Sequence, residues 1–285
     1  MGPTASGKSA LGVEVARALN GEIISADAFS VYRGLDIGTD KPDVETRRLI
    51  RHHVVDVVEP DERYSAGDFV AAADTAIADI RHRGRTPIVV GGTHFYIRAL
   101  LLGLFPSPPR DPALVNRLNE QWRRDPARLY GRLEAIDAEA AARISPADRQ
   151  RVVRAIDVFE TTGLPMSAHW RRHLQRSRYQ ALLTAPLLCR EILCARIERR
   201  VDIIFASGLV EEVNQILASG VSHDAHALKA IGYRQVVAML EGRCGLSTAM
   251  SETKVSSRRL AKRQLTWLRH LREGRLQWVP PVEDG

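Results

Sequence analysis

The chain has 285 residues, of which 41 are lysine or arginine and 34 are aspartate or glutamate, so its formal net charge is +7 at pH 7. With 45% hydrophobic and 26% charged residues, its composition is that of a globular protein, which excludes disordered and fibrous classes. No apolar run approaches the roughly 20 residues that span a membrane, no signal-peptide pattern is present, and the three cysteines lack metal-ligand spacing, so we expect a cytoplasmic protein with no membrane partner.

The first residues form a phosphate-binding motif. Residues 2–9, Gly-Pro-Thr-Ala-Ser-Gly-Lys-Ser, match the pattern G-x-x-x-x-G-K-[ST]. Glycines let the backbone point several N–H groups at one anion, the lysine supplies positive charge, and the final serine hydroxyl can hold Mg²⁺. The motif predicts a phosphate site, with Mg²⁺ as cofactor on Ser9, made by Gly2, Pro3, Thr4, Ala5, Ser6, Gly7, Lys8 and Ser9.

A helix is predicted directly after this loop, because Leu11, Val15 and Leu19 recur every four residues. The N-terminus of that helix adds its own attraction for phosphate. A phosphate loop of this kind normally follows a buried strand, whereas only Met1 precedes it here. We therefore expect that the first core strand is missing from the sequence as written and that the natural start lies upstream.

Strands and helices alternate through the first hundred residues. We expect strands at 22–26, 54–58 and 86–90 and helices at 65–81 and 95–102. Such alternation predicts an α/β fold, a parallel sheet flanked by helices. In such sheets ligands bind beyond the carboxyl ends of the strands, and Asp27 follows the first strand there. The loops after residues 26 and 90 should join the phosphate loop on one rim, beside a glycine-rich binding loop at 31–42.

A proline-rich segment ends this region. Beyond it, residues 111–179 show helical patterns and no convincing strand, which predicts an all-helical insertion. The remaining chain, residues 1–110 and 180–285, would then form the α/β core with its C-terminal helices. A strand is expected within 180–188, followed by helices at 190–205 and 208–217.

Two stretches concentrate basic residues, with aromatic residues between them. Residues 161–190 and 253–272 contain no acidic residue, and most of the chain's excess positive charge lies in residues 101–200. Basic side chains neutralise phosphates, and aromatic rings stack on bases. A solvated helix face would explain one such stretch alone, but the two together favour a nucleic-acid partner.

These motifs, in this order, resemble the tRNA dimethylallyltransferases, also called isopentenyl-tRNA transferases. No C-terminal zinc-finger pattern is present, so the resemblance is to the bacterial form. It runs from Gly2 to about Trp278. It rests on the loop at 2–9, Ser-Ala-Asp at 25–27, Val-Tyr-Arg-Gly-Leu-Asp-Ile-Gly-Thr at 31–39, Tyr-Ser-Ala-Gly-Asp-Phe at 64–69, Gly-Gly-Thr at 91–93, Arg-Gln-Arg-Val-Val-Arg-Ala at 149–155, Arg-Ile-Glu-Arg-Arg at 196–200, Ala-Ile-Gly-Tyr-Arg at 230–234 and Ala-Lys-Arg-Gln-Leu-Thr-Trp at 261–267.

The resemblance implies transfer of a dimethylallyl group from dimethylallyl diphosphate to the exocyclic amine of the adenine on the 3′ side of the anticodon in tRNA. By position, Asp27 resembles the family's general base, and Thr4 and Arg196 resemble the pair that steadies the diphosphate in the loop. The implied partners are the anticodon stem-loop of tRNA and dimethylallyl diphosphate, and we expect a monomer. Positions that resemble tRNA contacts are Asp27, Ala28, Phe29, Ser30, Thr93, Gln150, Arg151, Arg154, Lys229, Gly232, Tyr233 and Arg234.

Two other functions stay open on the sequence. A phosphate loop alone does not separate ATP from another diphosphate, so a small-molecule or nucleoside kinase is one alternative. A catalytically dead tRNA-binding protein is the other. Two of the site residues also have a structural alternative to a functional role. Tyr233 could pack in the core, and Arg196 could be an arginine on a helix surface. Ser30 and Asp40 depart from the glutamine and the small residue that are usual in the family.

Overall fold

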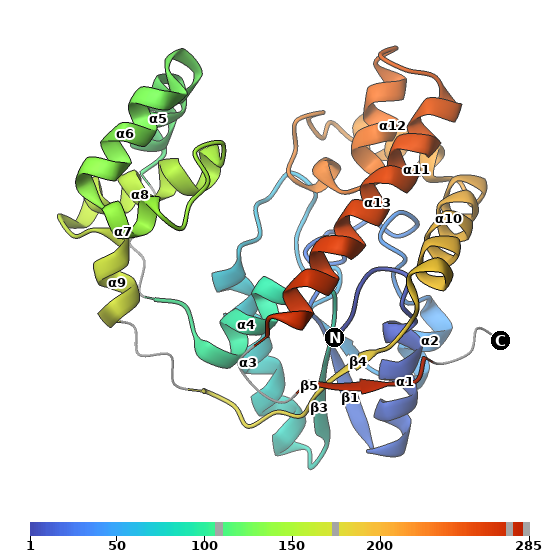
Figure 1. The fold of residues 1–285 in the computed structure, drawn as a ribbon. Helices are drawn as coiled ribbons and strands as arrows, with labels where there is room; N and C mark the ends of the chain where they lie inside the picture. Colours follow the sequence, from blue (N-terminus) through green and yellow to red (C-terminus); the bar gives the residue numbers. More distant parts are fainter. Residues whose placement is uncertain (106–110, 173–176, 272–275, 282–285) are drawn as a thin grey trace. The chain divides into compact units, whose positions relative to one another are not determined.

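The computed structural model describes residues 1–105, 111–172, 177–271 and 276–281. The chain divides into two compact units, one formed by residues 1–101 and 177–285 and the other by residues 102–176 (Figure 1). The sequence predicts the boundaries of the helical unit at residues 111 and 179. Within the described ranges, no helix combines the length and the apolar character needed to cross a membrane.

The described residues of the first unit form two parallel sheets, one of three strands and one of two (Figure 1). In the order β2-β1-β3, strand β1 (Gly21–Ser25) pairs in parallel with both β2 (His52–His53) and β3 (Thr86–Val90). Strand β4 (Leu183–Pro186), which lies within the segment 180–188 where a strand is predicted, pairs in parallel with β5 (Leu276–Val279). The sequence did not predict β5. The predicted parallel-sheet core is therefore confirmed. The strand expected upstream of the phosphate loop concerns residues outside this sequence and stays a prediction.

The helices of the first unit flank these strands. Helix α3 shows why they form: Ser65 Oγ accepts the Asp68 N–H at 3.2 Å, and the Asp68 carboxylate accepts the Ser65 N–H at 2.8 Å. Helix α13 packs against α10 and α12 (Figure 1). The helical elements are α1 (Lys8–Ala18), α2 (Val44–Leu49), α3 (Ala66–His82), α4 (His94–Leu102), α10 (Arg190–Ala206), α11 (Leu209–Ala218), the 3₁₀ turn η1 (Ala227–Lys229), α12 (Tyr233–Leu240) and α13 (Leu246–Arg269).

The strand predicted at 54–58 is wrong. Val54 and Asp56 have φ values of 61° and 56°, which an extended strand does not contain. The Asp56 carboxylate accepts hydrogen bonds from Lys41 at 2.5 Å and Arg47 at 2.7 Å, which hold it in a turn. The alternation of valines with polar residues therefore reflects a compact loop, and the strand that pairs with β1 lies just before it.

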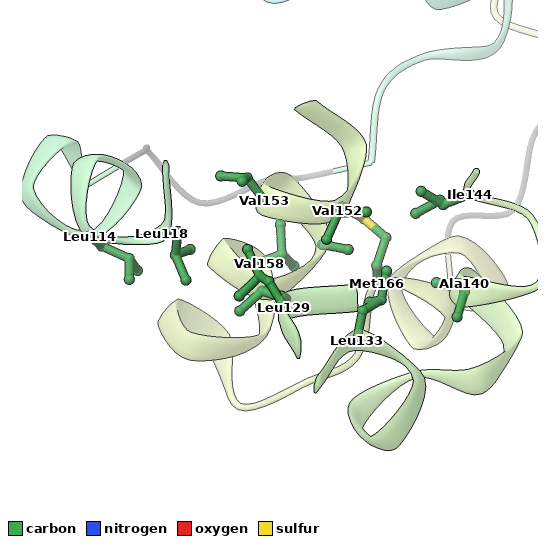
Figure 2. Packing of buried hydrophobic residues seen from close by; sticks show 13 residues of the cluster. Leu114, Leu118, Leu129, Leu133, Ala140, Ile144, Val152, Val153, Val158 and Met166 are labelled. Atoms are coloured by element: carbon green, nitrogen blue, oxygen red, sulfur yellow. The ribbon is translucent and has the colours of Figure 1, made fainter. Parts of the chain in front are cut away.

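The regular elements among the described residues of the second unit are all helices, as the sequence predicts for residues 111–179. Four of its five helices begin at an aspartate whose side chain accepts a backbone N–H of the first turn: Asp111, Asp125, Asp137 and Asp148. Figure 2 shows the apolar side chains that these helices bury against one another. The helices are α5 (Pro112–Arg124), α6 (Pro126–Ile136), α7 (Ala138–Ala141), α8 (Arg149–Thr162) and α9 (Met166–Arg172).

The carboxyl ends of β1 and β3 are held together by backbone contacts in the first unit. The Ala26 N–H donates to the Val90 carbonyl at 2.7 Å, and the Thr93 N–H donates to the Ala26 carbonyl at 3.1 Å. A Cβ placed on Gly91 would lie 2.1 Å from the Ala26 carbonyl oxygen, so only glycine fits there. This close approach fixes the loop that follows β1, which carries Asp27.

We expect Gly91→Ala to lower the melting temperature clearly, because the added methyl group meets backbone that cannot turn aside. Overpacking of this kind costs about 1–3 kcal/mol. Gly67→Ala is the control: its Cβ would have 3.4 Å of room on helix α3, where alanine is favoured over glycine. Thermal unfolding followed by circular dichroism compares the two variants. Equal melting temperatures would contradict the packing argument.

Candidate active site

A cavity of about 340 Å³ lies beyond the carboxyl ends of β1 and β3, within the first unit. It joins segments that lie far apart in the sequence. As the sequence predicts, the loops after β1 and β3 meet the phosphate loop on one rim. The residues that matter for the chemistry below are Thr4, Lys8, Ser9, Asp27, Asp40, Arg200, Lys229, Arg234 and Gln264, all of which line this cavity.

The phosphate loop has the shape of an anion site. Ala5 and Gly7 adopt φ values of 60° and 77°, which turn the backbone before α1 begins. Gly7 gives α1 no side-chain cap, so the first N–H groups of the helix remain available to an anion. The buried Ser6 hydroxyl has no hydrogen-bond partner among the described residues. The loop thus offers several unsatisfied donors at one place.

Two cations lie beside the loop. Lys8 Nζ donates to the Pro3 carbonyl at 3.4 Å, and burial, together with the charge of Arg200, lowers the pKa of Lys8 to about 8. Arg200 Nη1 donates to Thr4 Oγ1 at 2.8 Å, and its Nε lies 3.4 Å from Asp40 Oδ2. This arrangement favours a bound anion, because the anion would restore the full charge of the lysine.

Arg196 is predicted to steady the diphosphate together with Thr4, and the structure shows a hydrogen bond to the Thr4 hydroxyl from its neighbour Arg200. Both arginines belong to α10 and lie about one helical turn apart, but only Arg200 lines the cavity. The motif Arg-Ile-Glu-Arg-Arg does not distinguish them. The way α10 packs against the phosphate loop decides which of the two arginines reaches Thr4. No local sequence pattern encodes that packing. The role predicted for the pair stays a prediction.

Asp27 is held by its own loop. Its Oδ1 accepts the N–H groups of Phe29 at 2.9 Å and of Ser30 at 3.2 Å. Its Oδ2 has no hydrogen-bond partner among the residues described, and Asp27 lines the cavity. One oxygen therefore orients the carboxylate while the other is available to take a proton.

The neighbours of Asp27 that were predicted to contact tRNA have structural contacts of their own. The Thr93 hydroxyl accepts the Ala28 N–H at 3.0 Å, which ties together the loops after β1 and β3. The ring of Phe29, which lines the cavity, stacks on His226 with centroids 6.0 Å apart. Ser30 is buried, and its Oγ lies 2.9 Å from Ser25 Oγ.

Tyr233 is fully buried, so the core-packing alternative describes it better than a direct tRNA contact. Its hydroxyl donates to the Glu212 carboxylate and accepts the Gly38 N–H at 3.1 Å. Burial and the nearby Glu212 charge raise the pKa of Tyr233. Gly232 is also buried, whereas Lys229 and Arg234 are exposed and line the cavity. Tyr233 thus holds the loop around Gly38 in place.

The second unit carries the remaining predicted tRNA contacts on the first turns of α8. Gln150 and Arg151 are exposed, and Arg151 Nε lies 3.4 Å from Asp148 Oδ2. Arg154 forms an ion pair with the buried Asp157. Part of the basic character seen in the sequence is therefore balanced by neighbouring carboxylates.

Residues 253–269 of the second basic stretch belong to α13. Lys254 pairs with Asp202 at 2.6 Å and Arg258 with Glu198 at 2.7 Å, both on α10. Further along α13, the exposed basic side chains include those of Arg259, Lys262, Arg263 and Arg269. These provide a positive face on the same unit as the cavity.

Comparison with known sequences supports the resemblance. A family model described as IPP transferase matches residues 30–271. A tRNA dimethylallyltransferase 1 of Trichlorobacter lovleyi is 46% identical to the chain, over 100% of this chain and 93% of the relative. A tRNA dimethylallyltransferase of Thermomicrobium roseum is 44% identical, over 100% of this chain and 86% of the relative.

Solved structures have the same fold. The full-length tRNA isopentenylpyrophosphate transferase of Bacillus halodurans superposes with a TM-score of 0.72 at 35% identity, over 98% of this chain and 88% of that one. A eukaryotic dimethylallyltransferase acting on tRNA superposes with a TM-score of 0.81 at 28% identity, over 94% of this chain and 68% of that one. The predicted α/β core flanked by helices agrees with both.

We expect the affinity for inorganic diphosphate to fall as pH rises through about 8, the pKa of Lys8. A bound anion raises that pKa, so binding takes up a proton once Lys8 is neutral, and affinity drops by up to about tenfold per pH unit. Titration calorimetry between pH 7 and 9 measures this. Lys8→Arg stays charged and controls for the ionisation of the ligand itself. The same pH dependence in both proteins would refute the role of Lys8.

Proposed function

The chain belongs to the IPP transferase family, and from this premise we propose that it transfers a dimethylallyl group from dimethylallyl diphosphate to tRNA. The acceptor is the exocyclic amine of the adenine on the 3′ side of the anticodon. One observation carries the proposal: a single cavity contains a phosphate loop flanked by two cations and a carboxylate with one oxygen available. The 46% identity over the whole chain favours this function over a kinase.

The reaction breaks the bond between the allylic carbon and a diphosphate oxygen and forms a bond from that carbon to nitrogen. Negative charge develops on the departing diphosphate, so the main task of the site is to stabilise that charge. Lys8, Arg200 and the free N–H groups of the loop surround the proposed diphosphate position. The Thr4 hydroxyl, which accepts from Arg200, can still donate its own proton to a phosphate oxygen.

Asp27 is the proposed general base. As the bond between carbon and nitrogen forms, the exocyclic amine loses a proton, and Asp27 Oδ2 is placed to accept it. The two backbone N–H groups on Oδ1 keep the carboxylate from rotating. General-base catalysis of this kind contributes about 10²–10⁴-fold to a rate.

We propose that magnesium binds together with the diphosphate, with Ser9 as a protein ligand. Magnesium prefers oxygen donors and usually keeps several waters while it contacts substrate phosphates and one or two protein groups. Ser9 and Asp40, both with oxygen-bearing side chains, line the cavity, so the residues present fit such an ion. When bound, the ion would neutralise part of the charge of the diphosphate.

For the RNA partner, we propose that the exposed Lys229 and Arg234 at the cavity contact the anticodon loop. The target adenine must leave its stack to enter, which costs a few kcal/mol and least in a single-stranded loop. Other proposed contacts are the basic face of α13 and, in the helical unit, Gln150, Arg151 and Arg154. We further propose that the protein acts as a cytoplasmic monomer.

The direct test is product formation. Unmodified anticodon stem-loop RNA, dimethylallyl diphosphate and Mg²⁺ are incubated with the protein, and mass spectrometry should detect one added dimethylallyl group per RNA. Asp27→Asn keeps an oxygen acceptor for the backbone but loses the base, so kcat should fall about 10²–10⁴-fold while RNA affinity stays within about threefold. A folded wild-type protein that makes no product, or an Asp27→Asn variant with full activity, would contradict the proposal.

A second experiment separates the two arginines of α10. Arg200→Gln removes the positive charge of the guanidinium that binds the Thr4 hydroxyl. It should lower kcat/KM for dimethylallyl diphosphate about 10²–10³-fold, the loss typical of one stabilising donor. Arg196→Gln makes the same change one turn away and should cause a much smaller loss. The opposite order of the two losses would return the role to Arg196.

A further inference from the structure

Gln264 on α13 is a second residue that holds Thr4, through the threonine backbone N–H and not through its hydroxyl. We propose that Gln264 is a positioning residue, which sets the shape of the phosphate loop for the diphosphate. The proposal rests on the proposed function, because it concerns the site where the diphosphate would bind.

The side-chain amide of Gln264 bridges two loops. Its Oε1 accepts the Thr4 N–H at 2.9 Å, and its Nε2 donates to the Gly92 carbonyl at 2.9 Å. Gln264 is buried, with 8% of its surface exposed. A single amide thus satisfies a donor of the phosphate loop and an acceptor of the loop after β3, which only a side chain with both groups can do.

The bridge leaves no room for a side chain at Gly92. A Cβ placed on Gly92 would lie 2.6 Å from Gln264 Nε2 and 3.3 Å from the Gly2 carbonyl oxygen. The helix that carries Gln264 is itself fixed nearby, because the ring of Trp267 stacks on His94 with centroids 4.5 Å apart. Two contacts therefore seat α13 on the segment after β3, and the phosphate loop rests against the same place.

Two side chains from different helices bind different atoms of Thr4. Arg200 of α10 binds its hydroxyl, and Gln264 of α13 binds its backbone N–H. The Thr4 N–H is therefore committed to the protein, and the loop has its shape before any anion arrives. A loop that is already ordered loses less conformational freedom on binding, which strengthens the affinity for the diphosphate.

The chemistry of the bridge tells which substitutions test it. Gln264→Met keeps a similar shape but leaves the Thr4 N–H and the Gly92 carbonyl buried without partners. Gln264→Glu keeps an acceptor for Thr4 but sets a carboxylate against the Gly92 carbonyl and adds negative charge beside the phosphate loop. Both should disturb the loop, the second also by electrostatic repulsion of the diphosphate.

The chain offers a matched control in Gln235 of α12. It is also buried, its Oε1 accepts the Gly232 N–H at 2.9 Å, and its Nε2 donates to Ser256 Oγ at 3.2 Å. Gln235→Met therefore breaks the same pair of hydrogen bonds, but away from the phosphate loop. If Gln264 only stabilises the fold, Gln235→Met and Gln264→Met should change the affinity for diphosphate by the same amount.

The experiment measures three quantities on each full-length variant: the dissociation constant for inorganic diphosphate by titration calorimetry, the affinity for anticodon stem-loop RNA, and the melting temperature. Gln264→Met should weaken diphosphate binding about tenfold and Gln264→Glu at least as much. Gln235→Met should leave that constant within twofold although it also lowers the melting temperature. RNA affinity should stay within about threefold in both Gln264 variants.

The outcomes are distinct. Diphosphate binding of wild-type strength in both folded Gln264 variants would overturn the proposal, and so would equal weakening in Gln264→Met and Gln235→Met. If Gln264→Met does not fold, diphosphate binding of wild-type strength in the near-isosteric Gln264→Glu overturns the proposal. If the wild-type protein itself binds no diphosphate, the proposed function fails and this inference falls with it.

Discussion

Hydrogen bonds from two distant helices meet at Thr4 and fix the phosphate loop. Arg200 binds the threonine hydroxyl and Gln264 binds its backbone N–H, although these residues lie about two hundred or more positions further along the chain. The loop is short and turns through positive φ values, so it has little intrinsic order of its own. Its shape therefore depends on α10 and α13 being packed in place, and the end of the chain helps to build the site at its beginning.

Contacts between distant segments also orient the Asp27 carboxylate, which lines the same cavity. The loops after β1 and β3 approach so closely that Gly91 must be a glycine, and the Thr93 hydroxyl holds the Ala28 N–H. Asp27 then binds its own loop through one oxygen and presents the other. Cations and a fixed carboxylate that line one cavity suit a reaction in which a diphosphate leaves and an amine loses a proton.

Local sequence patterns predicted what local physics determines. The phosphate loop with its helix, the strands β1 and β3, helix α3 and the position of Asp27 after a strand all follow from motif, periodicity or the rule for open sheets. Tertiary contacts decided the rest. The turn at Val54 depends on ion pairs to Asp56, the choice of Arg200 over Arg196 depends on how α10 lies against the loop, and the burial of Tyr233 depends on Glu212. Gln264 lies in the motif at 261–267, but no role was predicted for it, because a lone glutamine on a basic helix looks exposed.

The most direct measurement is a crystal structure of the protein with a non-reactive analogue of dimethylallyl diphosphate. The account predicts that the diphosphate lies in the phosphate loop within hydrogen-bond distance of Lys8 and Arg200, with its allylic carbon directed toward Asp27 Oδ2. A diphosphate bound outside the loop, or an allylic carbon directed away from Asp27, would contradict it.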